Sequence, residues 1–200
     1  MLFICIAMAT ASAFKYKLIL GSGSPRRQQL LKDVGFEFEI KSLDADESFP
    51  SHLKAEQIAL YLSEKKASVY PDKLKSNELL ITADTIVWID GIVLNKPSGE
   101  FEAKQMLQLL SGKMHQVFTG VCIIGEGKKI SFTDETKVWF KHLTEAQIDF
   151  YIKNYKPFDK AGSYGAQDWL GLIGVEKIEG SYFNVMGLPV HRLYKELMNI

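Results

Sequence analysis

Residues 21–27 read Gly-Ser-Gly-Ser-Pro-Arg-Arg, an order of residue types that is typical of an anion-binding turn. The segment follows the apolar run 18–20 and leads into a helical pattern from Gln28. Ser24 is a good N-cap residue and Pro25 suits the first helical position, where free N–H groups attract anions such as phosphate. Arg26 and Arg27 add forked donors that match phosphate oxygens. A surface turn with two solvated arginines is the plainer alternative, and the spacing is not that of a Walker loop.

Asp84 is a carboxylate inside the apolar stretch 79–88. Burying a carboxylate costs free energy unless it is paired or binds a cation, so we expect the residue to have a use. A general base or a metal ligand is one interpretation. The local pattern supports equally well a residue at a strand end that bonds to backbone.

The pair Asp90-Gly91 predicts a type I′ hairpin, which would set Ile89 opposite Ile92. This register places Lys96 beside Asp84 along the sheet. A regular pleat puts these two side chains on opposite faces, whereas a bulge, or a strand that ends at Asn95, would bring them together. The sequence leaves that choice open.

Three further polar residues stand out less strongly. Lys66 lies four residues after Leu62, near the apolar face of a predicted helix, where a lysine commonly packs its stem and keeps its ammonium in water. Glu47 belongs to an acidic loop and by itself reads as a solvated charge. Gln167, in the glycine-rich segment 161–174, has the donors and the acceptor that suit a nucleobase edge, although a plain turn explains the segment too.

Periodicity and turn signals predict the elements that must position these residues. Ile58, Leu62 and Val69 mark the buried face of one helix, and Thr144 with Gln147 forms a capping box for another. The expected strands are 18–20, 36–40, 79–89, 92–95, 116–124, 129–140 and 175–178; the expected helices run from Pro25 to near Gly35, 55–70, from a cap at Ser98 to Leu110, 144–154 and 188–198, with a loop at 161–174. This alternation predicts an α/β or mixed α+β fold.

Composition limits the classes of partner. Lys plus Arg and Asp plus Glu are 24 each in 200 residues, so no global charge draws the chain to nucleic acid or to a membrane. Cys5 and Cys122 make no disulfide framework, which suits a reducing cytoplasm. The four histidines show no metal-ligand spacing, which argues against a zinc site.

Residues 1–13 are apolar and are expected to be an extension ahead of a single domain that occupies 14–200. Ala11-Ser12-Ala13 resembles a signal-peptidase site, so a cleaved export signal is the alternative. No basic residue precedes the apolar run, as such a signal would normally show, and the run is too short to span a bilayer.

Five segments occur in an order that one protein family shares. They are residues 22–27, Ala83-Asp84-Thr85 with Lys96-Pro97, Leu110-Ser111-Gly112-Lys113 with His115 and Thr119-Gly120, Asp159-Lys160-Ala161-Gly162 through Gln167, and Gly187-Leu188-Pro189. Together they resemble the Maf family of nucleoside triphosphate pyrophosphatases, from about Tyr16 to the C-terminus. The resemblance implies a twisted mixed sheet in two lobes that enclose a cleft. The family usually has alanine at Gly21, and we expect only a looser turn from the change.

The resemblance also implies an activity, the hydrolysis of a nucleoside triphosphate to the monophosphate and pyrophosphate with a divalent cation, Mg²⁺ or Mn²⁺. The Ser-Pro-Arg-Arg, Ala-Asp-Thr and glutamine motifs look like the dTTP/UTP branch, and modified pyrimidine triphosphates are also substrates in the family. Matched by position, the roles are Asp84 as proton acceptor, Ser22, Arg26 and Arg27 as phosphate-binding loop, Glu47, Lys66 and Lys96 as charged cleft residues, Arg26, Thr85 and Gln167 as residues of substrate choice, and Glu47 with Asp84 as the metal-binding carboxylates.

Two other functions remain as alternatives. One is a pyrophosphatase for 7-methyl-GTP or for damaged purine triphosphates. The other is a regulatory nucleotide-binding protein linked to septum formation, from which the family takes its name. The sequence leaves the oligomeric state open, a homodimer included, and favours neither a nucleic acid nor a membrane as partner.

Overall fold

The structure is a computed structural model and describes residues 14–200. Both interpretations of residues 1–13, the extension and the export signal, therefore concern a segment outside the described residues. Within 14–200, every helix is too short or too polar to cross a membrane.

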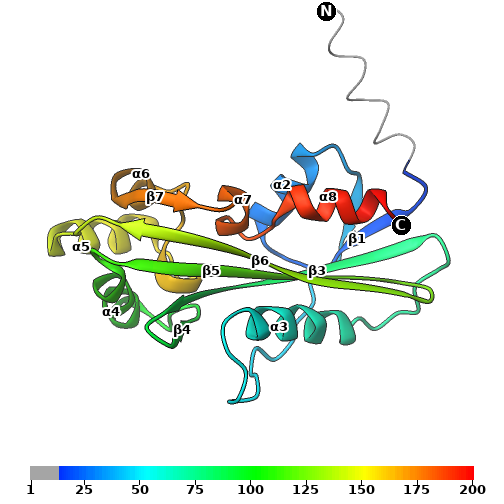
Figure 1. Cartoon of the computed structure of the whole chain (residues 1–200), viewed down its shortest axis with the longest axis horizontal. Coiled ribbons are helices and arrows are strands. Elements are labelled where there is room, and N and C mark those ends of the chain that lie inside the picture. The colour runs from blue at the N-terminus through cyan, green and yellow to red at the C-terminus, as the bar shows by residue number, and fades with distance from the viewer. Residues whose placement is uncertain (1–13) are drawn as a thin grey trace, which may run out of the picture.

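Seven strands form one mixed sheet with helices on both faces (Figure 1). The order from one edge is β2-β1-β3-β5-β6-β7, and β4 pairs with β3. Strand β1 pairs in parallel with β2 and β3, whereas the remaining pairs are antiparallel. The strands are β1 (Lys17–Leu20), β2 (Phe38–Ile40), β3 (Glu78–Ile89), β4 (Ile92–Leu94), β5 (Met114–Gly125), β6 (Lys128–Phe140) and β7 (Val175–Glu179). The predicted α/β class is confirmed.

The helices begin and end close to the predicted positions, except that no helix was expected at Tyr182–Val185 and that three further expectations differ. They are α2 (Pro25–Asp33), α3 (Glu56–Ser68), α4 (Glu100–Leu110), α5 (Glu145–Tyr155), the 3-10 turn η1 (Ala161–Ser163), α6 (Trp169–Gly174), α7 (Tyr182–Val185) and α8 (Val190–Met198). The predicted capping box at Thr144 and the register of Ile89 opposite Ile92 are both confirmed.

The first exception is Val69, which was expected on the buried face of α3. It is 42% exposed because the helix ends at Ser68 and Val69 is only its C-cap. The second is Ser98, which precedes the N-cap Gly99; its amide and hydroxyl bind the Glu102 carboxylate instead. The third is the segment 161–174, predicted as a loop, whose last six residues form α6.

Two hydrophobic cores divide the molecule into two lobes along the sheet. One packs α4, α5 and α6 against the ends of β3, β5 and β6 and contains Leu107, Tyr151 and Leu170. The other packs α2 and α8 against β1 and the opposite ends of β3 and β5, and contains Leu31 and Leu193. Helix α3 covers the other face of the sheet (Figure 1).

Strand β3 runs through both lobes and has a gap in its pairing between them. Its last contact with β1 is at Ile81, and its pairing with β4 begins at Val87, so residues 82–86 have only β5 as a sheet neighbour. Successive side chains of a strand point to opposite faces. Asp84 and Thr85 therefore diverge, but both face the opening that the gap leaves.

Helix α3 packs directly against Gly120, the β5 residue opposite Asp84. A Cβ at Gly120 would lie 2.1 Å from the backbone oxygen of Ala59, which leaves no room for any other residue type. One α3 carbonyl, that of Ser63, accepts a hydrogen bond from Thr82 Oγ1 at 2.7 Å. These two contacts fix the helix above β3 and set the position of Lys66 on its last turn.

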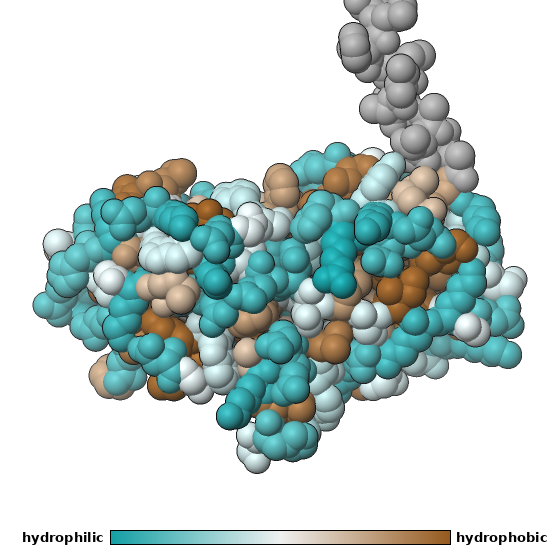
Figure 2. Space-filling model, in the orientation of Figure 1, coloured by the Kyte–Doolittle hydropathy of each residue, from teal (hydrophilic) through white to brown (hydrophobic). Residues whose placement is uncertain are grey.

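Figure 2 shows that hydrophilic residues cover most of one face, with the hydrophobic ones in separate small groups. A mixed surface of this kind agrees with the equal numbers of acidic and basic residues in the chain. Any strong attraction for a charged ligand must therefore be local.

Candidate active site

A cavity of about 400 Å³ opens between the two lobes, at the gap in β3. It joins Asp84 and Arg26 in one space, as the predicted chemistry requires. The cavity is lined by all nine residues that the sequence singled out, namely Ser22, Arg26, Arg27, Glu47, Lys66, Asp84, Thr85, Lys96 and Gln167.

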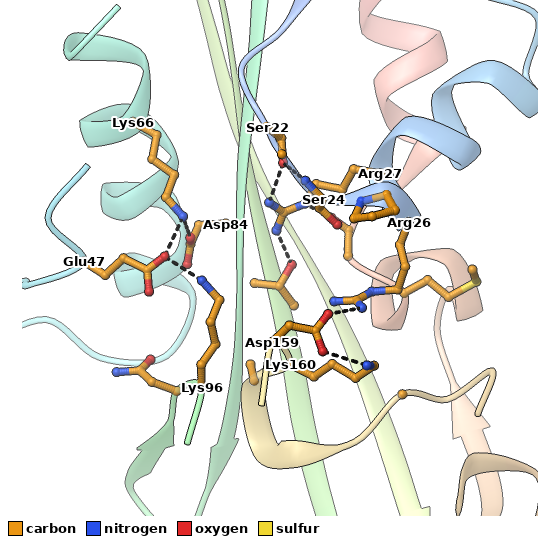
Figure 3. Close-up of a pocket in the computed structure, with 18 of the residues that line it drawn as sticks. Ser22, Ser24, Arg26, Arg27, Glu47, Lys66, Asp84, Lys96, Asp159 and Lys160 are labelled. Carbon is orange, nitrogen blue, oxygen red and sulfur yellow. Dashed lines mark hydrogen bonds and ion pairs between the residues drawn. The ribbon is translucent and has the colours of Figure 1, made fainter. Parts of the chain in front are cut away.

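Four charged side chains form one side of the cavity, which we call the ionic wall: Glu47, Lys66, Asp84 and Lys96. Lys66 Nζ contacts Asp84 Oδ1 and, at 3.0 Å, Glu47 Oε1 (Figure 3). Lys96 Nζ reaches the same Glu47 oxygen at 2.8 Å. Strand β4 ends at Leu94, so of the arrangements left open for Lys96, a strand end before it is the one that occurs.

Burial and the two neighbouring lysines shift the pKa of Glu47 in opposite directions. Partial burial alone would raise the Glu47 pKa, but the Lys96 hydrogen bond and the Lys66 charge outweigh it and hold the pKa below its ordinary value. Asp84 is 7% exposed and pairs with Lys66, so the buried carboxylate is compensated as its apolar surroundings demand. The Lys66 ammonium is largely buried and pairs with both carboxylates rather than extending into water, whereas Glu47 is paired but remains exposed.

The loop 41–55 brings Glu47 to the ionic wall although it has no helix or strand of its own. Lys65, the neighbour of Lys66 on α3, holds that loop in place. Its Nζ donates to Asp46 Oδ2 at 2.9 Å and to the Ser48 backbone oxygen at 2.8 Å, on either side of Glu47.

The start of α2 forms the opposite side of the cavity. Arg27 donates three hydrogen bonds, to the Gly187 backbone oxygen at 2.7 Å, Thr85 Oγ1 at 3.0 Å and Ser22 Oγ at 3.3 Å. Each acceptor is uncharged. Burial lowers the pKa of Arg27, and the nearby Asp84 charge opposes that shift. Because no acceptor neutralises the guanidinium directly, its positive charge remains effective in the cavity.

The glycine-rich turn before α2 is as predicted, with two differences of detail. Ser24 occupies the N-cap position, but its side chain makes no capping hydrogen bond. At Gly21, a Cβ would lie 2.8 Å from side-chain atoms of Leu43 and Thr82. Alanine at this position would therefore require the side chains of Leu43 and Thr82 to shift, because the turn is packed tightly here.

Arg26 lies nearer the mouth and pairs with Asp159 across the cavity, with Nη1 and Oδ2 2.9 Å apart (Figure 3). Lys160 Nζ binds the other Asp159 oxygen at 2.7 Å. Burial by itself would raise the pKa of Asp159. Lys160 and Arg26 together lower it by more, so the pKa lies below its ordinary value. Sequence reasoning assigned neither Asp159 nor Lys160 a role, although both lay inside a quoted motif.

The remaining side of the cavity is the segment Tyr164–Asp168, which we call the amide wall. Tyr164 Oη lies 2.7 Å from the buried His115 Nε2, and its ring packs edge-on to those of His115 and Phe140. Gln167 Oε1 is buried, and no residue in 14–200 donates a hydrogen bond to it. An unpaired buried acceptor costs free energy, so its presence beside a cavity is a sign of ligand recognition.

The ionic wall also has the donors for a divalent cation. Within 14–200, no three His, Cys, Asp or Glu side chains gather into a metal cluster. Two carboxylates, Glu47 and Asp84, nevertheless converge on one positive charge, that of Lys66. Mg²⁺ is commonly held by one or two carboxylates together with substrate phosphates and water, so the pair fits this ion or Mn²⁺.

The family model described as Maf-like protein matches residues 17–200. The dTTP/UTP pyrophosphatase of Phocaeicola vulgatus is 55% identical over 93% of this chain and 97% of its own length. The proteins of the same name from Porphyromonas gingivalis and Flavobacterium johnsoniae are 50% and 48% identical, each over at least 92% of this chain and 94% of their own. With a match of this extent on both measures, the chain belongs to the Maf family.

Proposed function

We propose that this protein hydrolyses dTTP and UTP to the monophosphate and pyrophosphate. The observation that carries the proposal is that one cavity joins a buried carboxylate, Asp84, to two arginines at a helix start and to two lysines. A triphosphate needs this concentration of cations, and its hydrolysis needs a base beside them. The names of relatives that are about half identical over nearly the whole chain support the substrate.

Asp84 is the residue that orients and deprotonates the attacking water, which adds to the α-phosphorus in line with the leaving pyrophosphate. Arg26 and Arg27, with the free N–H groups at the start of α2, bind the phosphate oxygens and stabilise the charge that develops on the pyrophosphate. Lys66 and Lys96 lie on the same side of the cavity as Asp84 and both pair with Glu47. Phosphate oxygens of the substrate can replace Glu47 as the partner of these two lysines.

Glu47 and Asp84 would hold the divalent cation, Mg²⁺ or Mn²⁺. Such an ion neutralises phosphate charge and lowers the pKa of bound water. Lys66 contacts both carboxylates, so it must move aside, at least in part, when they bind the ion.

The amide wall selects the base. Gln167 carries both a donor and an acceptor, and the edge of thymine or uracil offers an O4 acceptor beside an N3–H donor. That Gln167 lines the cavity and that its Oε1 has no donor among residues 14–200 support this role. Arg26 and Thr85 complete the set that we assign to substrate choice, with Thr85 acting partly through its contact with Arg27.

A nucleotide panel tests the proposal. Pyrophosphate release is measured from dTTP, UTP, dGTP, dITP and 7-methyl-GTP, with and without Mg²⁺ or Mn²⁺. We expect kcat/KM for dTTP and UTP to exceed the purine values by about tenfold or more, because a site built to pair with one edge leaves its polar groups unpaired with another. Preference for 7-methyl-GTP or dITP would reject the substrate assignment. Tight triphosphate binding without pyrophosphate release would favour a regulatory protein.

Residues 14–200 as one domain, a cytoplasmic location and a homodimer remain predictions.

A further inference from the structure

The hydroxyl of Tyr151 contacts both ends of the turn that carries Gln167. The Gly165 amide donates to Tyr151 Oη at 3.1 Å, and Tyr151 Oη donates to Asp168 Oδ2 at 2.8 Å. The same turn is closed by a hydrogen bond from the Asp168 amide to the Gly165 backbone oxygen at 3.0 Å. Gln167 is the third of these four residues, so it lies between the two points that the hydroxyl holds.

Tyr151 itself is firmly placed. It is 0% exposed in the core between α4, α5 and α6, and its ring stacks on Tyr155 with centroids 5.1 Å apart. Burial and the Asp168 carboxylate raise the pKa of its hydroxyl, which therefore stays protonated and able to donate. Its helix is held at the start by the Thr144 capping box and by Lys104, which contacts Glu145 at 2.8 Å.

The Asp168 carboxylate has little freedom against the turn. A Cβ at Gly165 would lie 2.6 Å from Asp168 Oδ2, so the carboxylate packs directly over that glycine. Lys160 Nζ lies 3.7 Å from the same oxygen, and Lys160 also binds the Asp159 that pairs with Arg26. The turn is thus connected through polar contacts to the mouth of the cavity.

We propose that Tyr151 is a positioning residue for base selection, which acts by holding the turn 165–168 so that the Gln167 amide meets the substrate base in one orientation. This inference rests on the proposed function, because it assigns a determinant of its selectivity. Tyr151 does not line the cavity and needs no contact with substrate.

The test variant is Tyr151→Phe, which keeps the buried ring and removes only the hydroxyl. Two quantities are measured: kcat/KM for dTTP relative to dGTP, and the equilibrium Kd of each nucleotide with EDTA present, so that no turnover occurs. Loss of one hydrogen-bonding group should lower both selectivity ratios about three- to tenfold. The change should lie mainly in KM for dTTP, with kcat nearly unaltered.

Two backgrounds separate positioning from general damage. In Gln167→Ala, adding Tyr151→Phe should change neither ratio further, because the amide that the turn positions is gone. Asp168→Asn keeps an oxygen acceptor for the hydroxyl and should retain more of the selectivity than Tyr151→Phe does. Tyr194→Phe is the matched control, since it removes a tyrosine hydroxyl from the other core, where Tyr194 packs beside Phe36.

The outcomes distinguish this inference from the proposed function. If the wild-type protein binds dTTP selectively but releases no pyrophosphate, the proposed reaction fails and Tyr151 is judged on the Kd ratio alone. If Tyr151→Phe leaves both ratios at the wild-type value, or lowers them equally with and without Gln167, the inference is overturned. A wild-type protein without selectivity would overturn it as well.

Discussion

The ionic wall and the amide wall border the same cavity, but their polar groups are satisfied in different ways. In the ionic wall, two carboxylates and two ammonium groups neutralise one another through three contacts. In the amide wall, the contacts come mainly from hydroxyl, amide and ring groups such as Tyr151 and His115, and Gln167 Oε1 has no donor within 14–200.

This difference indicates how each wall responds to change. Pairs of full charges keep a buried carboxylate ionised at modest cost and can be redistributed when phosphates or a cation arrive. In the amide wall one carboxylate, Asp168, accepts from the Tyr151 hydroxyl, and the other hydrogen bonds join neutral groups. Hydrogen bonds of this kind depend on geometry, so they discriminate by shape. Substitutions that alter charge in the ionic wall should therefore change the rate, whereas substitutions behind the amide wall should change selectivity or stability.

The largest effect is expected from Asp84→Asn. The amide keeps the size and part of the hydrogen bonding of Asp84 but cannot accept a proton from water. Loss of a general base typically lowers turnover about 10²–10⁴-fold, and we expect a loss of that order in pyrophosphate release from dTTP. Lys66 retains Glu47 as a partner, so the variant should remain folded.

The control for that variant is Asp90→Asn. Asp90 is exposed in the hairpin turn with φ of 51°, a conformation that asparagine also adopts, and among residues 14–200 it pairs only with Lys113, at 3.1 Å. Its turnover should match the wild type. Unchanged turnover in Asp84→Asn, with circular dichroism and melting temperature preserved, would remove Asp84 from the mechanism and with it the contrast between the walls.

Arg27 combines features of the ionic wall and the amide wall, because its guanidinium is charged but its hydrogen-bond acceptors are uncharged oxygens. Arg27→Lys preserves the charge and removes the fork that reaches Ser22, Thr85 and Gly187 together. We expect the free energy of unfolding to fall by about 2 kcal/mol, since a partly buried set of hydrogen bonds to a charged group is lost. Urea denaturation of the substrate-free protein measures this change.

Arg26→Lys is the matched substitution at the neighbouring residue. Arg26 makes one ion pair with the largely exposed Asp159, and such pairs contribute about 0–1 kcal/mol, so its free energy of unfolding should hardly change. Equal losses in the two variants would show that the fork of Arg27 adds no stability beyond what an ordinary exposed arginine provides.

Most elements could be predicted because their signals are local. The hairpin at Asp90-Gly91 and the capping box at Thr144 depend on residues within a few positions of one another, and both occur as expected. Asp84 could be singled out because a carboxylate in an apolar strand conflicts with its surroundings. The family resemblance then supplied Glu47 and Lys66, which local patterns alone describe as ordinary surface charges.

The arrangement of the site could not be predicted because it depends on contacts between distant segments. The gap in the pairing of β3 lies between the end of β1 and the start of β4, and the residue pattern of neither strand predicts it. The loop that carries Glu47 is placed by Lys65, whose side chain looks like any solvated lysine. Tyr151 reads as one more core aromatic, because the turn that it holds lies 14 residues away at Gly165.

A pH-dependent effect on stability concerns His115, which keeps the core behind the amide wall neutral. Burial lowers its pKa to about 3, whereas a histidine in the unfolded chain has a pKa near 6.5. Between these values the unfolded chain binds a proton that the native protein excludes, so stability is lost as the pH falls. The contribution is at most about 1.4 kcal/mol per pH unit, and urea denaturation between pH 6.5 and 4.5 measures it.

His115→Gln should flatten this pH dependence, because glutamine does not titrate and can still hydrogen-bond to Tyr164 Oη. His52→Gln is the control, since His52 is exposed in the loop before α3 and its loss should leave the slope unchanged. An equal slope in the wild type and in His115→Gln would mean that the buried imidazole accepts a proton as readily as a solvated one. The core behind the amide wall would then tolerate charge, and the distinction between the two walls would reduce to the residues that line the cavity.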